Sequence, residues 1–221
     1  MASVTAKKAA DLHKNVPPDW YARSIKENFL QRFWHLTRFA EIKNMIEPFD
    51  SAQGRKILDV GSADGTFTKI ILEKSKAQKV IGIDVLASSV SYAKRKFARS
   101  KKMSFQVADA HNLPFKENEF DAVFCLEALE HVEDPVKVVI EMNRVLKTNG
   151  YMVILVPSEN LLFKLLWPFW TMTRGKIWKG THLNKFSSDQ VLDVIKKCGF
   201  IIEKNHKFLC GMLQAAKAVK K

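Results

Sequence analysis

The stretch Ile57–Gly65, with the sequence ILDVGSADG, constrains the fold of this chain more than any other feature. An apolar run ends in an acidic residue and passes through a glycine-containing turn into Thr66–Lys74, a segment with the composition of a helix. Gly61 and Gly65 permit positive φ angles and a close approach of backbone to ligand. The first turn of the following helix offers unpaired N–H groups. The pattern predicts a parallel strand, a turn that faces a nucleotide-like ligand, and a helix.

A second apolar run, VIGIDV at Val80–Val85, supports this interpretation. It ends in Asp84, 23 positions after Gly61, where an acid can hold the two ribose hydroxyls of an adenosine. The turn does not match the dinucleotide pattern G-x-G-x-x-G, because Ala63 and Thr66 occupy two of the glycine positions. The alternative is an ordinary strand–turn–helix of an α/β fold without this ligand.

Composition and length indicate one globular domain. The chain has 221 residues, of which 47% are hydrophobic, enough for one sizeable core. No apolar run approaches 18 residues, and the N-terminus lacks the apolar segment of a signal peptide. Cys125, Cys198 and Cys210 lie far apart without clustered histidines. We therefore expect no metal site and no disulfide framework. A cytoplasmic location is expected, because free cysteines suit a reducing compartment.

Strand-like and helix-like segments alternate along most of the chain. Apolar runs predict strands at Lys56–Val60, Lys79–Asp84, Ser104–Val107, Ala122–Leu126, Tyr151–Val156 and Phe200–Lys204. The intervening segments predict helices at Thr66–Lys74, Ala87–Arg99, Pro135–Lys147 and Ser187–Cys198. This alternation predicts an α/β fold with a mostly parallel sheet, helices on both faces, and ligands at the carboxyl ends of the strands.

The two ends of the chain are less regular. Residues 1–15 are predicted to be flexible, and apolar residues recur every three or four positions from Asp19 to Glu47, which predicts one or two helices. Residues 1–50 would therefore form a flexible tail and a helical cap, and residues 51–221 the α/β domain. Leu213–Val219 is either a final antiparallel strand or a helix, because its propensities do not decide.

The turn after the first strand resembles the D-x-G-x-G-x-G turn of class I S-adenosylmethionine-dependent methyltransferases, with Ala63 in place of the middle glycine. Further strings extend the resemblance over roughly residues 55–205: GIDV, DAHNLPF, LEALEHVEDP, RVLKTNGYMVILVP and HLNKFSSDQVLDVIKKCGF. They are similar to the methyltransferase type 11 group, which includes ubiquinone- and menaquinone-biosynthesis enzymes. The resemblance implies a Rossmann-like, seven-stranded, mostly parallel sheet, S-adenosylmethionine as cofactor, and methyl transfer to a small-molecule or lipid-like acceptor.

The strand ends supply residues suited to successive parts of this cofactor. Asp59 and the glycine turn would face the methionine portion, Asp84 the ribose, and Asp109 the adenine amino group. The predicted cofactor-binding set is Asp59, Gly61, Ser62, Ala63, Gly65, Asp84, Val85, Asp109, Ala110, Leu126 and Glu127.

Methyl transfer from a sulfonium is an in-line displacement, so the protein mainly aligns the reactants and excludes water. A general base is needed only when the acceptor loses a proton as it reacts. The candidate catalytic residues are Glu127, His131 and His182, and Glu130 is a further acid in the same segment. Each has a structural alternative, as a helix-capping, packing or solvated side chain, and no metal ligands are predicted.

The segment Leu161–Lys179 departs from a plain sheet core. It places three tryptophans and two phenylalanines among basic residues, within an insertion at about residues 158–184 after the fifth strand. The insertion is predicted to be an aromatic lid over the active site or a peripheral membrane contact, and both favour an apolar or amphiphilic acceptor, of which a lipid-linked molecule is one example. Trp20 and Tyr21 would either close the other side of the pocket or pack as ordinary core residues.

The net charge of +13 suggests a second class of binding partner. Residues 161–221 hold 12 basic residues against three acidic ones, which favours a phosphate-bearing partner or else reflects solvated lysines. A nucleic-acid methyltransferase is the second hypothesis. However, the fourth strand ends in CLEALEH and lacks the N/D-P-P-Y/F pattern that stacks on a flipped base, so nucleic acid is not the expected partner. A non-catalytic cofactor-binding scaffold is the third.

Overall fold

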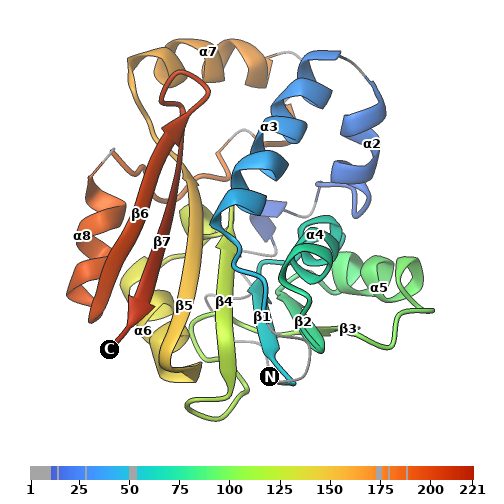
Figure 1. Cartoon of the computed structure of the whole chain (residues 1–221). Helices are drawn as coiled ribbons and strands as arrows, with labels where there is room; N and C mark the ends of the chain where they lie inside the picture. Colours follow the sequence, from blue (N-terminus) through green and yellow to red (C-terminus); the bar gives the residue numbers. More distant parts are fainter. Residues whose placement is uncertain are drawn as a thin grey trace.

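The computed structural model describes residues 11–13, 15–27, 29–49, 54–172, 176–178, 180–187 and 189–221. They form a seven-stranded sheet in the order β3-β2-β1-β4-β5-β7-β6 (Figure 1). The strands are β1 (Lys56–Val60), β2 (Lys79–Asp84), β3 (Met103–Val107), β4 (Phe120–Leu126), β5 (Leu146–Pro157), β6 (Phe200–Phe208) and β7 (Leu213–Lys220). The five strands from β1 to β5 pair in parallel. The predicted Rossmann-like α/β fold with a mostly parallel sheet is confirmed.

The C-terminal strand takes the antiparallel alternative. β7 lies between β5 and β6 and runs antiparallel to both. Lys217 in this strand is only 1% exposed, and its ammonium is paired with Glu47 and Glu203 and lies 4.8 Å from the ring centre of Tyr151. The two carboxylates offset the cost of burying the lysine, and Glu47 links the N-terminal segment to the C-terminal strand.

Helices cover both faces of the sheet. The α-helices are α2 (Trp20–Glu27), α3 (Phe29–Met45), α4 (Thr66–Ser75), α5 (Ala87–Lys96), α6 (Pro135–Val145), α7 (Leu161–Met172) and α8 (Gln190–Lys197). Side chains alternate between faces along each strand, so Val123 packs with α6 and α8 whereas its neighbour Phe124 packs with α3 and α4. Asp134 caps α6 by accepting from the Lys137 backbone N–H, and Pro135 occupies the first turn.

Helices α2 and α3 precede the sheet within Asp19–Glu47, where the periodicity predicted one or two helices. The buried stripe of α3 contains two polar residues, His35 and Arg38, beside the apolar Phe39, Ile42 and Met45. The tail that was predicted to be flexible lies partly outside the described residues. Residues 11–13 are helical, and His13 is buried.

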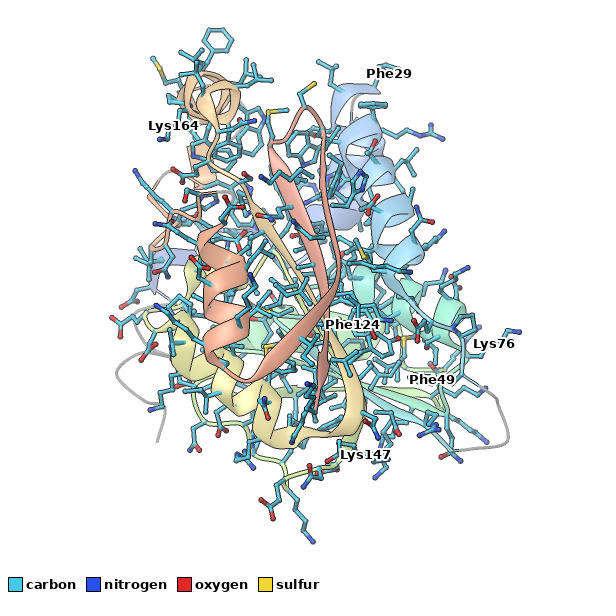
Figure 2. The ribbon with its side chains drawn as sticks, turned by 60° about the vertical axis from the view of Figure 1, so that its left-hand side comes forward. Phe29, Phe49, Lys76, Phe124, Lys147 and Lys164 are labelled. Atoms are coloured by element: carbon cyan, nitrogen blue, oxygen red, sulfur yellow. The ribbon has the colours of Figure 1, made fainter. Side chains whose placement is uncertain are left out.

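The insertion after β5 forms α7 and a short 3₁₀ helix, η3 (Lys176–Trp178). Residues 173–175 and 179 of the predicted lid lie outside the described residues. In Figure 1, α7, the tip of the β6–β7 hairpin and the start of α3 lie at the same end of the molecule. Figure 2, turned by 60°, places Lys164 and Phe29 at that same end.

Candidate active site

The turn after β1 is the base of the candidate site. Gly61 has φ 78°, and a Cβ placed on it would lie 2.4 Å from Cβ of Ala128. Gly65, at φ 76°, precedes α4, and a Cβ there would lie 2.7 Å from the Phe97 ring. The positive φ angles predicted for these two glycines are confirmed, and protein side chains leave no room for a Cβ at either position. Ala63 also adopts a positive φ, of 44°, at the position where the sequence departs from the family pattern.

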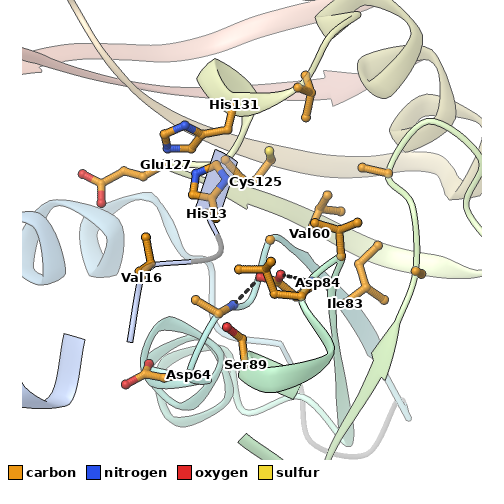
Figure 3. A pocket seen from close by; sticks show the side chains of 18 of the residues that line it. His13, Val16, Val60, Asp64, Ile83, Asp84, Ser89, Cys125, Glu127 and His131 are labelled. Carbon is orange, nitrogen blue, oxygen red and sulfur yellow. Dashed lines mark hydrogen bonds between the residues drawn. The ribbon is translucent and has the colours of Figure 1, made fainter. Parts of the chain in front are cut away.

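Asp84, at the end of β2, fastens this turn. Its Oδ2 accepts from the Ala63 backbone N–H at 2.9 Å, and its Oδ1 accepts from the Leu86 N–H at 2.8 Å (dashed lines in Figure 3). Burial raises the pKa of the Asp84 carboxyl, and these backbone N–H groups act in the opposite direction. Asp84 therefore holds the turn in shape while it lines the cavity.

Asp59 occupies a different environment. Its side chain is buried, and its Oδ2 accepts a hydrogen bond of 2.6 Å from the Thr68 hydroxyl on α4. Burial raises the pKa of Asp59 to about 7, against the lowering effect of that hydrogen bond. Asp59 is not among the described residues that line the cavity, so it supports the turn from behind.

A cavity of about 140 Å³ lies at the carboxyl ends of β1, β2 and β4. Among the predicted cofactor residues, the structure brings together on its wall Gly61, Ala63, Asp84, Val85, Asp109, Ala110 and Glu127. Ser62, Gly65 and Leu126 pack nearby without belonging to the lining. Lining residues that were not predicted from the sequence include His13, Asp64 and His111.

Two of these additional residues support predicted ones. The imidazole and backbone N–H of His111 lie 2.7 and 3.0 Å from Oδ1 of Asp109, which fixes that carboxylate at the end of β3. Asp64 accepts from the Ala22 backbone N–H at 3.2 Å and pairs with Lys96 at 3.0 Å. Asp64 thereby connects the turn after β1 to α2. Trp20 and Tyr21 line the cavity from the same helix, as predicted.

Glu127, just beyond β4, is held by the N-terminal helices. It has φ 55°, and its carboxylate accepts from the Arg38 guanidinium and, at 3.3 Å, from the Tyr21 hydroxyl. The side chains of Arg38 and Glu127 are 5% and 11% exposed, so the ion pair is nearly buried. The carboxylate is thus already engaged by two donors, which suits a positioning role.

The side chains of His131 and His182 contact each other, with ring centres 5.2 Å apart. Burial lowers the pKa of His131 well below its ordinary value and that of His182 to about 4. Both imidazoles are therefore neutral at pH 7. His131 lines the first cavity and His182 lines a second, of about 240 Å³, beside α7. Trp178 lines both cavities, so this aromatic group forms the boundary between them.

The sheet order and the glycine turn with acidic residues at the ends of β2 and β3 define a class I methyltransferase fold. Residues 58–154 match the methyltransferase domain family. The chain therefore contains a domain similar to that family, which agrees with the resemblance to S-adenosylmethionine-dependent methyltransferases seen in the sequence.

Three similar proteins illustrate the relationship. A demethylmenaquinone methyltransferase of Thermotoga maritima is 27% identical over 72% of this chain and 75% of its own length. One of Staphylococcus saprophyticus is 34% identical over 61% of each protein, which is less than two thirds of its length. A geranyl diphosphate methyltransferase structure, in complex with geranyl diphosphate and sinefungin, has a TM-score of 0.74 at 14% identity. That match covers 99% of this chain and 100% of the other.

Proposed function

We propose that this chain transfers the methyl group of S-adenosylmethionine to an amphiphilic acceptor with an apolar chain. The observation that carries the proposal is the pair of adjoining cavities, one at the strand ends and one beside α7, which share Trp178. A donor in the first and an acceptor in the second would meet at the boundary formed by His131, His182 and Trp178. That arrangement brings two reactants together and separates them from water, which is what an in-line methyl displacement requires.

In the first cavity, we assign the cofactor along the strand ends. Asp84 would hold the ribose hydroxyls, since its two oxygens can accept further hydrogen bonds besides those from the backbone. Val85 would pack on the adenine, with Asp109 beside the adenine amino group. The methionine portion would lie against the turn of Gly61 and Ala63, and Glu127 would border the sulfonium end. Asp59 is then a support for the turn.

In the second cavity, we assign the acceptor. Its wall combines the aromatic Phe163 and Trp167 with Lys164, Lys185 and His182. This mixture suits a molecule with an apolar chain and a polar or anionic head. Two similar proteins are named for demethylmenaquinone and for geranyl diphosphate, and both names agree with such an acceptor.

If the acceptor must lose a proton as it reacts, we propose that the His131–His182 pair accepts that proton. Nδ1 of His131 donates to the Thr181 carbonyl at 2.8 Å, which leaves the Nε2 lone pair to accept. Glu127 is a weaker candidate, because its carboxylate already accepts from Arg38 and Tyr21.

We further propose that the chain collects this acceptor at a bilayer surface. No described helix is long and apolar enough to cross a membrane. However, one end of the molecule, here called the apolar end, exposes large apolar side chains from α3 and α7 (Figures 1 and 2). They are Phe29, Leu30, Phe33 and Leu36 on α3, and Leu161, Leu162, Leu165, Leu166, Phe169 and Met172 on α7. The charged residues of Leu161–Met172 and Phe29–Leu36 are the basic Lys164 and Arg32, which fit anionic headgroups.

Calorimetry with S-adenosylmethionine, S-adenosylhomocysteine and NAD tests the cofactor assignment. We expect micromolar binding of both sulfur ligands and no binding of NAD. Methyl transfer is then measured with a radiolabelled donor on a prenylated quinol, the same quinol without its chain, geranyl diphosphate and an RNA oligonucleotide. Turnover that depends on the apolar chain supports the acceptor class. Turnover on RNA alone would establish the nucleic-acid alternative instead.

Vesicle cosedimentation tests the membrane contact. The double variant Leu165→Glu/Phe169→Glu should lose binding to vesicles that contain phosphatidylglycerol, while it keeps its affinity for S-adenosylmethionine. Ile140→Glu is the matched control, because Ile140 is also half exposed but lies on α6, away from the apolar end (Figure 1). Equal binding of the two variants, or no binding of the wild type, would contradict the proposal.

A further inference from the structure

The starting observation is a buried carboxylate beside the boundary of the two cavities. The side chain of Glu130, in the 3₁₀ helix η2 (Leu129–His131), is 2% exposed. Its Oε2 has no hydrogen-bond partner among the described residues. A buried acceptor without a donor costs free energy, so natural proteins usually supply such a group with a proton donor or a cation.

Two imidazoles adjoin this carboxylate. Nε2 of His131 lies 3.9 Å from Oε1 of Glu130, and one donor atom from each of Glu130, His131 and His182 lies within 4.8 Å of the others. Nδ1 of His131 donates to the Thr181 carbonyl, which fixes the tautomer and leaves the Nε2 lone pair facing Glu130. A hydrogen bond of this kind from the second ring nitrogen is usual for histidines that bind metals.

The backbone holds the three side chains in place. The Glu130 carbonyl accepts from the backbone N–H groups of Leu183 and Asn184, at 2.9 and 3.0 Å. The loop that carries His182 is thereby fastened to η2, which carries the other two donors. His182 is also stacked on Trp167, with ring centres 4.6 Å apart, and its Nδ1 lies 4.0 Å from Oε1 of Glu159.

We propose that Glu130, His131 and His182 bind one divalent transition-metal ion at the boundary between the donor and acceptor cavities. Two imidazoles and one carboxylate form a common donor set for catalytic Zn²⁺, and the same set binds Fe²⁺ with open positions. In a tetrahedral zinc site the donors lie roughly 3.3 Å apart, so side-chain movements of about 1 Å would complete the geometry. No metal site was expected from the sequence, because its cysteines are dispersed and its histidines are not clustered along the chain; His131 and His182 come together only in the fold.

The role of the metal rests on the proposed function, whereas its binding does not. An open coordination position would face the acceptor cavity and take a hydroxyl oxygen of the acceptor. With the metal bound, the Nε2 lone pair of His131 is a ligand and cannot serve as the base assigned above. The bound hydroxyl would instead lose its proton to water, because a metal ion lowers the pKa of a bound O–H group. The resulting oxyanion forms a bond to the methyl carbon as the carbon–sulfur bond breaks, and the sulfonium takes up the electron pair to become a neutral thioether. The metal keeps its charge throughout.

Metal binding to the untagged, full-length protein is the first test. Titration with Zn²⁺ should give one site per chain, and Co²⁺ should develop the visible absorption of a low-symmetry four- or five-coordinate site. Glu130→Gln and His182→Ala should each weaken Zn²⁺ binding by about 100-fold or more, since even second-shell changes cost 10- to 100-fold. His206→Ala is the matched control, because its imidazole is 58% exposed on β6 and pairs with Glu41. It should bind Zn²⁺ as the wild type does.

Three results would overturn the inference: no Zn²⁺ binding, equal affinity in Glu130→Gln and the His206→Ala control, or full methyl transfer by protein treated with a chelator. Glu130→Gln keeps the shape of the side chain, and its thermal unfolding shows whether the fold survives. Binding of S-adenosylmethionine is measured in parallel. If the cofactor binds and methyl transfer proceeds without metal, the inference fails while the proposed function stands. If neither cofactor nor acceptor is used although Zn²⁺ binds at this set, the proposed function fails alone.

Discussion

Replacing Arg38 with methionine should remove the ion pair that joins α3 to Glu127 in the candidate active site. Methionine keeps much of the apolar stem of the side chain but removes the charge that pairs with Glu127. Because the two side chains are 5% and 11% exposed, the Glu127 carboxylate would remain nearly buried without its cation. Breaking a buried pair in this way costs about 3–5 kcal/mol. The guanidinium also lies 5.6 Å from the Tyr21 ring centre, and loss of that contact adds about 0.5–1 kcal/mol.

A double-mutant cycle identifies the source of this cost. Glu127→Gln removes the negative charge but keeps the shape, so Arg38→Met/Glu127→Gln leaves no buried carboxylate at this point. We expect the double variant to be more stable than Arg38→Met alone, with a coupling free energy of at least about 2 kcal/mol. The assay is urea unfolding, with unchanged m-values as the condition for comparing free energies. A loss of less than about 1 kcal/mol in Arg38→Met, or strictly additive effects, would refute the reasoning.

Two further predictions concern the acidic residues at the strand ends. Asp84→Ala should weaken binding of S-adenosylmethionine by more than about tenfold, since hydrogen bonds to a charged group contribute roughly 1.5–3 kcal/mol. Calorimetry measures this affinity, and an unchanged value would mean that the ribose lies elsewhere. Asp59 has a pKa of about 7 when folded and an ordinary value of 3.8, so the folded state binds more protons between these pH values. Stability should therefore fall as the pH rises from about 4 to 7, by at most about 4 kcal/mol, and Asp59→Asn should remove this fall. Unfolding curves across that range with equal pH slopes in both proteins would contradict the prediction.

The parallel part of the sheet could be predicted because its local signals agree. Lys56–Val60 and Lys79–Asp84 are apolar runs that end at a glycine turn or an acid, and the structure has these bounds for β1 and β2. β7 could not be assigned, since its alanines and lysines favour no strand by propensity. It is a strand because β5 and β6 supply hydrogen-bond partners on both sides, and Ala215, Ala216 and Ala218 are buried between helices.

The residues of the candidate site, like the strands, could be predicted from the sequence only in part. Residues at strand ends could be predicted, because parallel strands place their carboxyl ends at one edge of the sheet. Arg38 and His13 could not, because they precede the sheet and reach the cavity or Glu127 only through tertiary packing. One signal for Arg38 was present in the sequence. A charged residue on the apolar stripe of Phe29–Met45 needs a buried partner, and Glu127, 89 positions later, provides it. Asp59 lies behind the turn because Thr68 binds its carboxyl group.

The cover over the first cavity has a consequence for kinetics. His13, Trp20 and Tyr21, from the N-terminal segment, line the cavity together with Trp178, from the insertion after β5. The ring centres of Trp20 and Trp178 lie 6.0 Å apart. We expect a spent cofactor, bound as proposed, to leave past this cover, which requires these contacts to separate. Opening of such a cover is slow compared with chemistry in many enzymes. We therefore expect the first turnover to run faster than later ones, with departure of S-adenosylhomocysteine setting the steady-state rate.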